Sequence, residues 1–338
     1  MTNSSYLHTF GANMPNVTTS AAIVAAIAAF MSSAPLTAYA AYPERQVEWV
    51  VPFSPGGGAD TVSRLLSTPL SAKFNQPVVV TNRPGAGGVI AEESVARANP
   101  DGYTLLYDAF AFAVNPAVRK LGFDPEGDFV PVIQMVDMPV LMVVPASAPY
   151  KTLTEFLDYA RKNPGKLSYG ITYGSAGHLT AEMLFKLSAN VDVLTVPYKG
   201  GSGMLAGVYS GEISSTFAVV PSMIGGIRAG KLRALAVAGS KRLAVLPDTP
   251  TFIEYGFPEI VVGEWGGLLA PKGTPPEVVE KLNREIRAIV ADPAVRAQFQ
   301  TRVGTDPIAG TPSEFSAFLK AEFRRWADLA RKVNLRVD

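Results

Sequence analysis

Four glycine-rich segments constrain the fold of this chain most, because each separates a short apolar segment from a segment with helical periodicity. They occupy residues 54–58, 82–88, 173–178 and 198–203. The apolar segments before them, such as VEWVVPF at residues 47–53, are rich in β-branched residues, as buried parallel strands are. The repeated order of strand, glycine loop and helix predicts an α/β fold built from doubly wound parallel sheets.

This order occurs in two series. Strands are predicted at residues 47–53, 78–81 and 103–107 in the first series, and at 166–170, 193–197, 215–219 and 232–238 in the second. A strand at 140–144 leads from the first series to the second, and a strand at 263–270 leads back to helices at 276–290, 293–302 and 312–333. We therefore predict two lobes with two crossings between them: residues 41–141 with 265–338 as lobe 1, and residues 142–264 as lobe 2.

The composition argues against several kinds of site. The 338 residues include no cysteine and only two histidines, so a Cys nucleophile, a disulfide, an iron–sulfur cluster and a zinc site are not expected. The net charge is +1 and no segment carries a long run of one sign, which argues against nucleic-acid binding. Residues 201–206 match a dinucleotide-binding glycine pattern but lack the acidic residue expected about 20 positions later, so no cofactor is expected.

The N-terminal segment has the pattern of an exported protein. Residues 21–31 form an apolar run of signal-peptide length, and Ala38, Tyr39 and Ala40 form a small–x–small cleavage site. The run is short for a membrane span. The pattern is atypical in one respect, since no Lys or Arg precedes Arg45. We expect a signal peptide of residues 1–40 that is cleaved near Ala40.

The glycine loops share a position at the carboxyl ends of predicted strands, where open α/β sheets bind ligands. Glycine lets backbone N–H groups approach a ligand closely, and the N-terminus of the next helix adds a partial positive charge. Each loop alone is also explained as a tight turn. Four loops of one character favour a shared site for a carboxylate or phosphate that needs no side-chain cation.

Three polar residues near these loops allow more than one interpretation. Asp60 is interpreted as the N-cap of a helix over residues 61–74 in preference to a catalytic acid. Ser175 is interpreted as a hydroxyl donor at a helix terminus, and His178 as a structural residue or part of the ligand rim. The alternative is a hydrolase with Ser175 as nucleophile and His178 as base, although two residues so close on one loop rarely reach triad geometry.

Longer motifs surround these loops. They read VPFSPGGGAD at residues 51–60, NRPGAGG at 82–88, PDGYTLL at 100–106, VPYKG at 196–200 and APKGTP at 270–275. In this order they resemble the Bug-type (TctC-like) extracytoplasmic receptors of tripartite tricarboxylate transporters, and the resemblance covers residues 42–338. It implies a type II periplasmic binding protein fold that closes on a small carboxylate. It also implies a periplasmic, monomeric protein with no enzyme activity, in transient contact with inner-membrane transporter subunits. A ligand sensor without a transport role is a further alternative.

The resemblance and the loop pattern together give a set of predicted ligand-binding residues. They are Phe53, Ser54, Gly57, Gly58, Asp60, Gly85, Ala86, Gly87, Phe110, Tyr173, Ser175, Ala176, His178, Tyr198, Lys199 and Gly200.

The rings near the predicted strand ends suggest the type of ligand. Phe53, Phe110, Phe112 and Tyr198 are expected to form an apolar slot beside the loop amides. The stretch Asp108-Ala109-Phe110 departs from the resemblance, since relatives place small and polar residues there. Asp108 is expected to repel a tricarboxylate, so the sequence favours an aromatic or aliphatic mono- or dicarboxylate over citrate.

Overall fold

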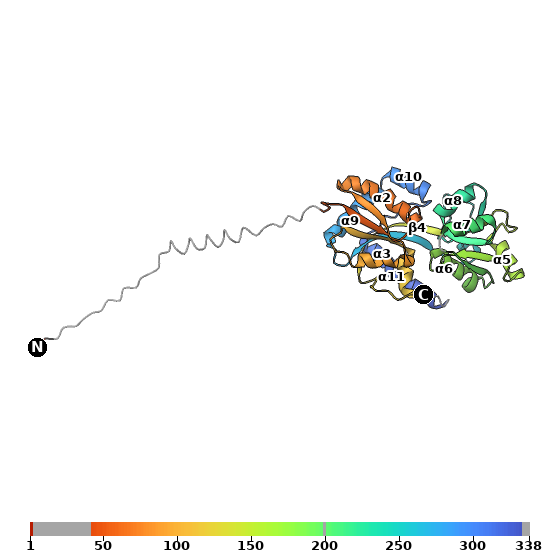
Figure 1. The fold of residues 1–338 in the computed structure, drawn as a ribbon, viewed down its shortest axis with the longest axis horizontal. Coiled ribbons are helices and arrows are strands. Elements are labelled where there is room, and N and C mark those ends of the chain that lie inside the picture. The colour runs from red at the N-terminus through yellow and green to blue at the C-terminus, as the bar shows by residue number, and fades with distance from the viewer. Residues whose placement is uncertain (3–41, 199–200, 333–338) are drawn as a thin grey trace. The chain divides into compact units, whose positions relative to one another are not determined.

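The computed structural model describes residues 1–2, 42–198 and 201–332, with only the backbone at residues 201 and 202. The chain divides into two units, Met1–Tyr42 and Pro43–Asp338. All helices and strands of the described residues lie in the second unit (Figure 1). The predicted signal peptide lies outside the described residues, apart from Met1 and Thr2.

The first series of elements alternates strands and helices as predicted. It contains β1 (Val47–Val51), α2 (Gly58–Phe74), β2 (Val78–Asn82), the 3-10 helix η1 (Ala86–Gly88), α3 (Val89–Ala96), β3 (Thr104–Ala109) and α4 (Phe110–Val118). The helix α4 is a finding that the sequence pattern did not predict. Its residues FAFAVNPAV are almost uniformly apolar and include a proline, so they show no clear helical period.

The long strand β4 (Phe129–Pro145) connects the two series. The sequence predicted only its last part, at 140–144. Its first part contains Pro131, Gln134 and Asp137, which interrupt an apolar strand pattern, and the register with β9 shifts twice there. Such irregularities re-aim or bend a strand without ending its pairing.

The second series follows the same alternation. It contains α5 (Leu153–Lys162), β5 (Ser168–Ile171), α6 (Ala176–Glu182), the π-helical η2 (Met183–Ser188), β6 (Leu194–Pro197), α7 (Gly201–Ser210), β7 (Ser215–Val219), α8 (Val220–Arg228) and β8 (Leu232–Val237). It is followed by η3 (Ile253–Tyr255), β9 (Gly263–Pro271), α9 (Pro276–Val290), α10 (Pro293–Arg302) and α11 (Pro312–Lys332). The predicted bounds of α9 and α10 are correct, because both have clear ends.

The strands form two sheets that share β4. The first has the order β2-β1-β3-β9-β4, and the second has the order β6-β5-β7-β4-β8. In each sheet three parallel strands are followed by an antiparallel strand, which is β9 in the first sheet and β4 in the second. The chain therefore crosses between the sheets twice, once along β4 and once between β8 and β9, as the sequence predicted (Figure 1).

Large apolar side chains fill the core. Trp49, Trp265 and Trp326 are at most 1% exposed, as expected for core residues. The ring of Trp326 on α11 packs edge-on against Phe110 of α4, with centroids 4.7 Å apart. Through this contact α11 packs against the first series of elements.

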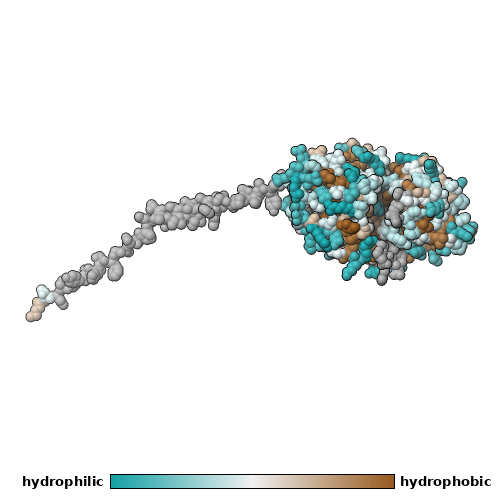
Figure 2. All heavy atoms as spheres, in the orientation of Figure 1, coloured by the Kyte–Doolittle hydropathy of each residue, from teal (hydrophilic) through white to brown (hydrophobic). Residues whose placement is uncertain are grey.

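The surface is mixed in character. On the face shown in Figure 2, apolar side chains lie in small groups among hydrophilic ones. In the part of the chain that the structure describes, no helix is both long enough and apolar enough to span a bilayer.

Candidate functional site

The loop between β1 and α2 ends in three consecutive glycines. Gly56 has φ +83°, a backbone conformation that favours glycine, and Gly57 is the N-cap of α2 with φ −77°. No side chain caps this helix terminus. The first N–H groups of a helix have no carbonyl partner within it, so they are available to a bound anion.

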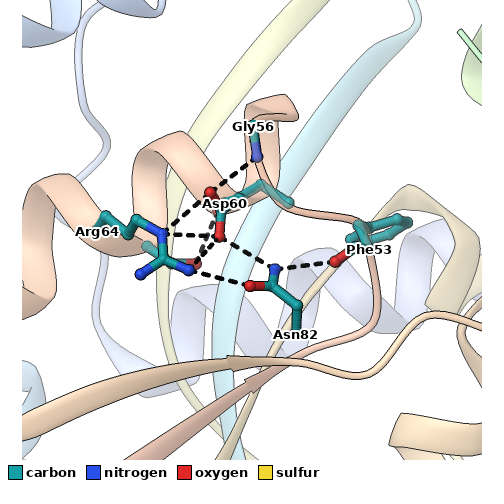
Figure 3. Close-up of polar contacts among 7 residues, drawn as sticks. Phe53, Gly56, Asp60, Arg64 and Asn82 are labelled. Carbon is teal, nitrogen blue, oxygen red and sulfur yellow. Dashed lines mark hydrogen bonds and ion pairs between the residues drawn. The ribbon is translucent and has the colours of Figure 1, made fainter. Parts of the chain in front are cut away.

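Asp60 holds this loop in place from inside the first turn of α2 (Figure 3). Its carboxylate accepts hydrogen bonds from the Gly56 N–H at 2.9 Å, from Arg64 Nε at 3.0 Å and from Asn82 Nδ2 at 3.0 Å. Asn82 Nδ2 also donates to the Phe53 carbonyl at 2.9 Å. Residues from β2 and α2 thereby fix both ends of the loop.

The predicted N-cap role of Asp60 is wrong. The helix begins at Gly58, three residues before the predicted start at residue 61. Asp60 lies inside the helix, and its carboxylate accepts a hydrogen bond from the Gly56 N–H of the preceding loop. Glycine has no side chain to cap a helix, so the sequence carries no capping signal at Gly57, where the helix starts. Burial alone would raise the pKa of Asp60, but the bonds from Arg64, Gly56 and Asn82 outweigh it and lower that pKa below its ordinary value.

The loop between β2 and α3 has an unusual backbone. Gly85, Ala86, Gly87 and Gly88 all have positive φ, at +148°, +48°, +66° and +106°. Two side chains of the α4 region support it. Arg119 Nη1 donates to the Ala86 carbonyl at 2.7 Å, and Asn115 Nδ2 donates to the Gly87 carbonyl at 3.0 Å. Because the Ala86 and Gly87 carbonyl groups accept these hydrogen bonds, the peptide groups of the loop are held in one orientation.

The loop between β5 and α6 is shaped by local bonds. Ser175 is the N-cap of α6, and its Oγ accepts from the His178 backbone N–H at 3.2 Å. The His178 ring is 3% exposed, and its Nδ1 accepts from the Gly174 N–H at 3.2 Å. His178 is therefore structural. The hydrogen bond to Ser175 Oγ is donated by the His178 backbone N–H, and the imidazole does not take part in it. These contacts therefore do not form a nucleophile–base pair.

The fourth loop contributes less than predicted. The Tyr198 ring packs against α7, where a Cβ on Gly207 would lie 2.4 Å from its hydroxyl oxygen. This position makes Tyr198 part of the packing under α7. Lys199 and Gly200 lie outside the described residues.

The first three loops line one cavity of about 240 Å³. Predicted residues in its lining are Phe53, Ser54, Gly85, Gly87, Phe110, Tyr173 and Ser175. Predicted residues outside its lining are Gly57, Gly58, Asp60, Ala86, Ala176, His178 and Tyr198. The sequence missed Pro52, Pro84, Gly88, Ala111, Asn115, Arg119, Thr172, Gly174 and Glu264 as individual lining residues.

Comparisons with known proteins show the family of this chain. The model of the family "Tripartite tricarboxylate transporter family receptor" matches residues 62–335. This chain belongs to that family. It is 33% identical to the protein BugT of Bordetella pertussis over 93% of this chain and 98% of that protein.

Two solved structures resemble most of the chain. Rpa4515 of R. palustris, solved with adipate, is 34% identical with a TM-score of 0.81, and covers 87% of this chain and 99% of its own. MatC of Rhodopseudomonas palustris, solved with bound malate, is 33% identical with a TM-score of 0.74 over 85% and 99%. These matches and the strand order confirm the type II periplasmic binding protein fold. The family comprises periplasmic solute-binding receptors.

The aromatic slot expected in this receptor is wrong in most of its parts. Phe110 and Phe112 are completely buried, the first against Trp326 and the second against Phe129, with centroids 5.3 Å apart in the second pair. Both lie in the first turn of α4, which packs into the core, whereas the sequence pattern placed them just after a strand. Phe110 borders the cavity, but of the four rings only the Phe53 side chain is partly exposed there.

Asp108 does not line the cavity, where it was expected to repel a tricarboxylate. It is completely buried, accepts from the Ala109 N–H at 2.7 Å and pairs with the carboxyl group of Glu92. Burial raises the pKa of Asp108 well above its ordinary value and raises that of Glu92 to about 7, although a bond from Asn115 favours the ionised Glu92. A negative charge on either carboxyl group opposes ionisation of the other.

This buried pair gives a pH prediction. Glu92 binds its proton more tightly in the folded state than in the unfolded state, where its pKa is near 4.5. Its contribution to stability is therefore complete below pH 4.5 and is lost as the pH rises toward 7, by about 1.4 kcal/mol per unit of pKa shift at most. Urea unfolding at pH 5 and pH 8 should show a smaller loss in Glu92→Gln than in wild type. Equal losses would contradict this assignment.

Among the described residues, no group of three or more His, Cys, Asp or Glu side chains is placed to hold a metal ion.

Proposed function

We propose that this receptor captures a small carboxylate in the cavity between the three glycine loops and delivers it to the membrane subunits of a tripartite transporter. One observation carries the proposal: loops after β1, β2 and β5, from both sheets, converge on one cavity. Gly85, Gly87 and Gly88 of the second loop and Gly174 of the third lie in its lining, so backbone groups line part of the space, and all four have positive φ. Relatives solved with adipate and malate support a carboxylate.

Closure of two lobes on the ligand follows from the sheet arrangement. We place lobe 1 at residues 41–141 and 265–338, and lobe 2 at residues 142–264. The crossing along β4 and the crossing before β9 are then the hinge. In this mechanism the β5–α6 loop of lobe 2 closes over the loops of lobe 1, and the closed monomer makes transient contact with the transporter.

For ligand type, we propose an aromatic or aliphatic mono- or dicarboxylate in preference to citrate. Three carboxylates need several cations or donors, and the described lining contains one cationic side chain, Arg119, and one acidic side chain, Glu264. Phe53 supplies an apolar contact. Because Phe110 and Phe112 are buried, they do not form a flat slot that would favour an aromatic ring. We therefore propose aliphatic and aromatic acids equally.

A thermal-shift screen against a carboxylate library tests this proposal. A ligand that binds only the folded state at about 100 times its Kd adds about 2.7 kcal/mol to the free energy of unfolding. At least one apolar carboxylate should raise the Tm, whereas citrate should not. A Tm that rises with citrate and with none of the apolar acids would overturn the proposed ligand type.

Export is the second part of the proposal. When the full chain is expressed in a Gram-negative host, the protein recovered from the periplasm should begin at or near Ala41. Mass spectrometry of the intact protein measures this directly. An uncleaved leader on protein that stays in the cytoplasm would contradict the proposed location.

A further inference from the structure

Arg119 and Glu264 give the cavity two charged side chains. They lie at opposite ends of α4, since Glu264 accepts from the Phe110 N–H at its start and Arg119 follows its last residue. Arg119 follows α4, and Glu264 lies on β9 opposite Met138 of β4. No ion pair joins Arg119 and Glu264 in the part of the chain that the structure describes. Each charged group is therefore available to another partner.

The Arg119 end is positive. The guanidinium bonds to the Ala86 carbonyl, and a Cβ on Gly87 would lie 3.1 Å from Nη2, so the cation rests on the glycine loop. Its buried Nε has no hydrogen-bond partner among the described residues. An anionic group beside this loop meets a guanidinium as well as backbone amides.

The Glu264 end is negative. The carboxyl group of Glu264 accepts a hydrogen bond from the Phe110 backbone N–H. The titratable groups that act on it are Asp137 of β4 and Asp108 and Tyr107 of β3, and none of them supplies a positive charge. Burial, and then the charge of Asp137, raise the pKa of Glu264 to about 7. A half-buried carboxylate without a cation is costly unless a ligand supplies one.

We propose that Glu264 determines specificity by pairing with a protonated amine on the ligand, while the glycine loop and Arg119 bind the ligand carboxylate. The favoured ligand is then an amino carboxylate, and a second carboxylate at the Glu264 end is disfavoured. This inference rests on the proposed receptor function and narrows its ligand class.

Ligands matched in length test the inference. Hexanoate, 5-aminopentanoate and adipate each carry a carboxylate on four methylene groups and end in a methyl, an ammonium and a carboxylate, respectively. The amino acid 2-aminohexanoate places the ammonium beside the carboxylate. Calorimetry at pH 8 should give at least one of the two amino ligands a Kd about tenfold or more below that of hexanoate, since its ammonium donates a charge-assisted hydrogen bond that a methyl group cannot form. Adipate should bind more weakly than hexanoate.

The variant Glu264→Gln keeps the shape of the side chain and removes its charge. It should bind hexanoate and the amino ligands within about threefold of each other, and it should bind adipate more tightly than wild type does. Glu322→Gln is the matched control. It removes another largely buried acid, which accepts from Trp326 Nε1 at 2.7 Å and lies outside this cavity. It should keep the wild-type order of affinities.

Two failures can be told apart. If no carboxylate of any kind binds the wild-type protein, the proposed function fails. If hexanoate or adipate binds wild type at least as well as both amino ligands, or if Glu264→Gln keeps a preference for the amino ligands, the receptor function stands and the role of Glu264 is overturned.

Discussion

Valine at Gly87 should remove most of the ligand affinity and also destabilise the fold. Gly87 lines the cavity with φ +66°, and a Cβ there would lie 3.1 Å from Arg119 Nη2. A β-branched residue in this conformation costs about 1–3 kcal/mol of stability. The side chain also occupies the space in front of the loop amides, so we expect at least about a tenfold rise in Kd, or about 1.4 kcal/mol. Urea unfolding and calorimetry measure the two effects separately.

Valine at Gly57 separates binding from stability. Gly57 has φ −77°, and a Cβ there meets only the Ser54 carbonyl, at 3.6 Å. The variant should still fold, at a cost of no more than about 1 kcal/mol, because valine is a poorer N-cap than glycine. It should bind more weakly, since the valine side chain lies beside the first N–H groups of α2, which no side chain caps. Gly225→Val on α8, where a Cβ meets nothing within 4 Å, is the control for a valine in open space. Wild-type affinity in a well-folded Gly57→Val protein would show that the β1–α2 loop is only a turn.

Alanine at Asp60 should destabilise the receptor by about 1.5–3 kcal/mol, the contribution of hydrogen bonds to a charged group. It removes the acceptor of the Gly56 N–H, of Arg64 Nε and of one Asn82 Nδ2 hydrogen, while Asn82 Nδ2 still donates to the Phe53 carbonyl. Ligand affinity should fall as well, since the same bonds fix the Phe53 end of the cavity. Chemical denaturation measures the first effect and calorimetry the second.

The pH dependence of this effect has a definite sign. The pKa of Asp60 is lowered in the folded state from an ordinary value of 3.8. Its stabilisation is therefore present above pH 3.8 and is lost as the pH falls through the folded-state value. Asp292→Ala provides the comparison, since Asp292 caps the exposed start of α10 and its loss should cost only about 1 kcal/mol. A similar small cost at both positions would contradict the bracing role of Asp60.

The sequence could predict elements whose ends are marked by a proline or by a glycine-rich loop. The predicted starts of β1 and β2 and both bounds of α9 and α10 are correct, and both helices begin at a proline. The predicted end of β1 is wrong by two residues, since the strand stops at Val51 and Pro52, which has no N–H to donate, does not continue it. The two crossings were predictable because a strand pattern appears between the two series and again after the second. The loops at 54–58 and 82–88 meet because the carboxyl ends of the parallel strands β1 and β2 share one edge of a sheet. The loop at 173–178 follows β5 of the second sheet and joins them because the two sheets share β4.

The rest of the site could not be predicted from local pattern. Arg119 reaches the cavity only because α4 follows β3 without a loop, and the uniformly apolar sequence of α4 hides that helix. Glu264 faces the cavity because β9 lies between β3 and β4, a pairing between residues far apart in the chain. The same long-range packing buries Phe110 and Phe112, which short-range reasoning placed in a ligand slot.

Equilibrium binding with recovery of the ligand tests the central claim most directly. The mature protein is titrated calorimetrically with the carboxylate that gives the largest thermal shift, and the bound molecule is then released and identified by mass spectrometry. The account predicts one molecule bound per chain, weaker binding in Gly57→Val, and recovery of the ligand unchanged after prolonged incubation. Failure of every carboxylate to bind, or conversion of the bound molecule into a product, would contradict it.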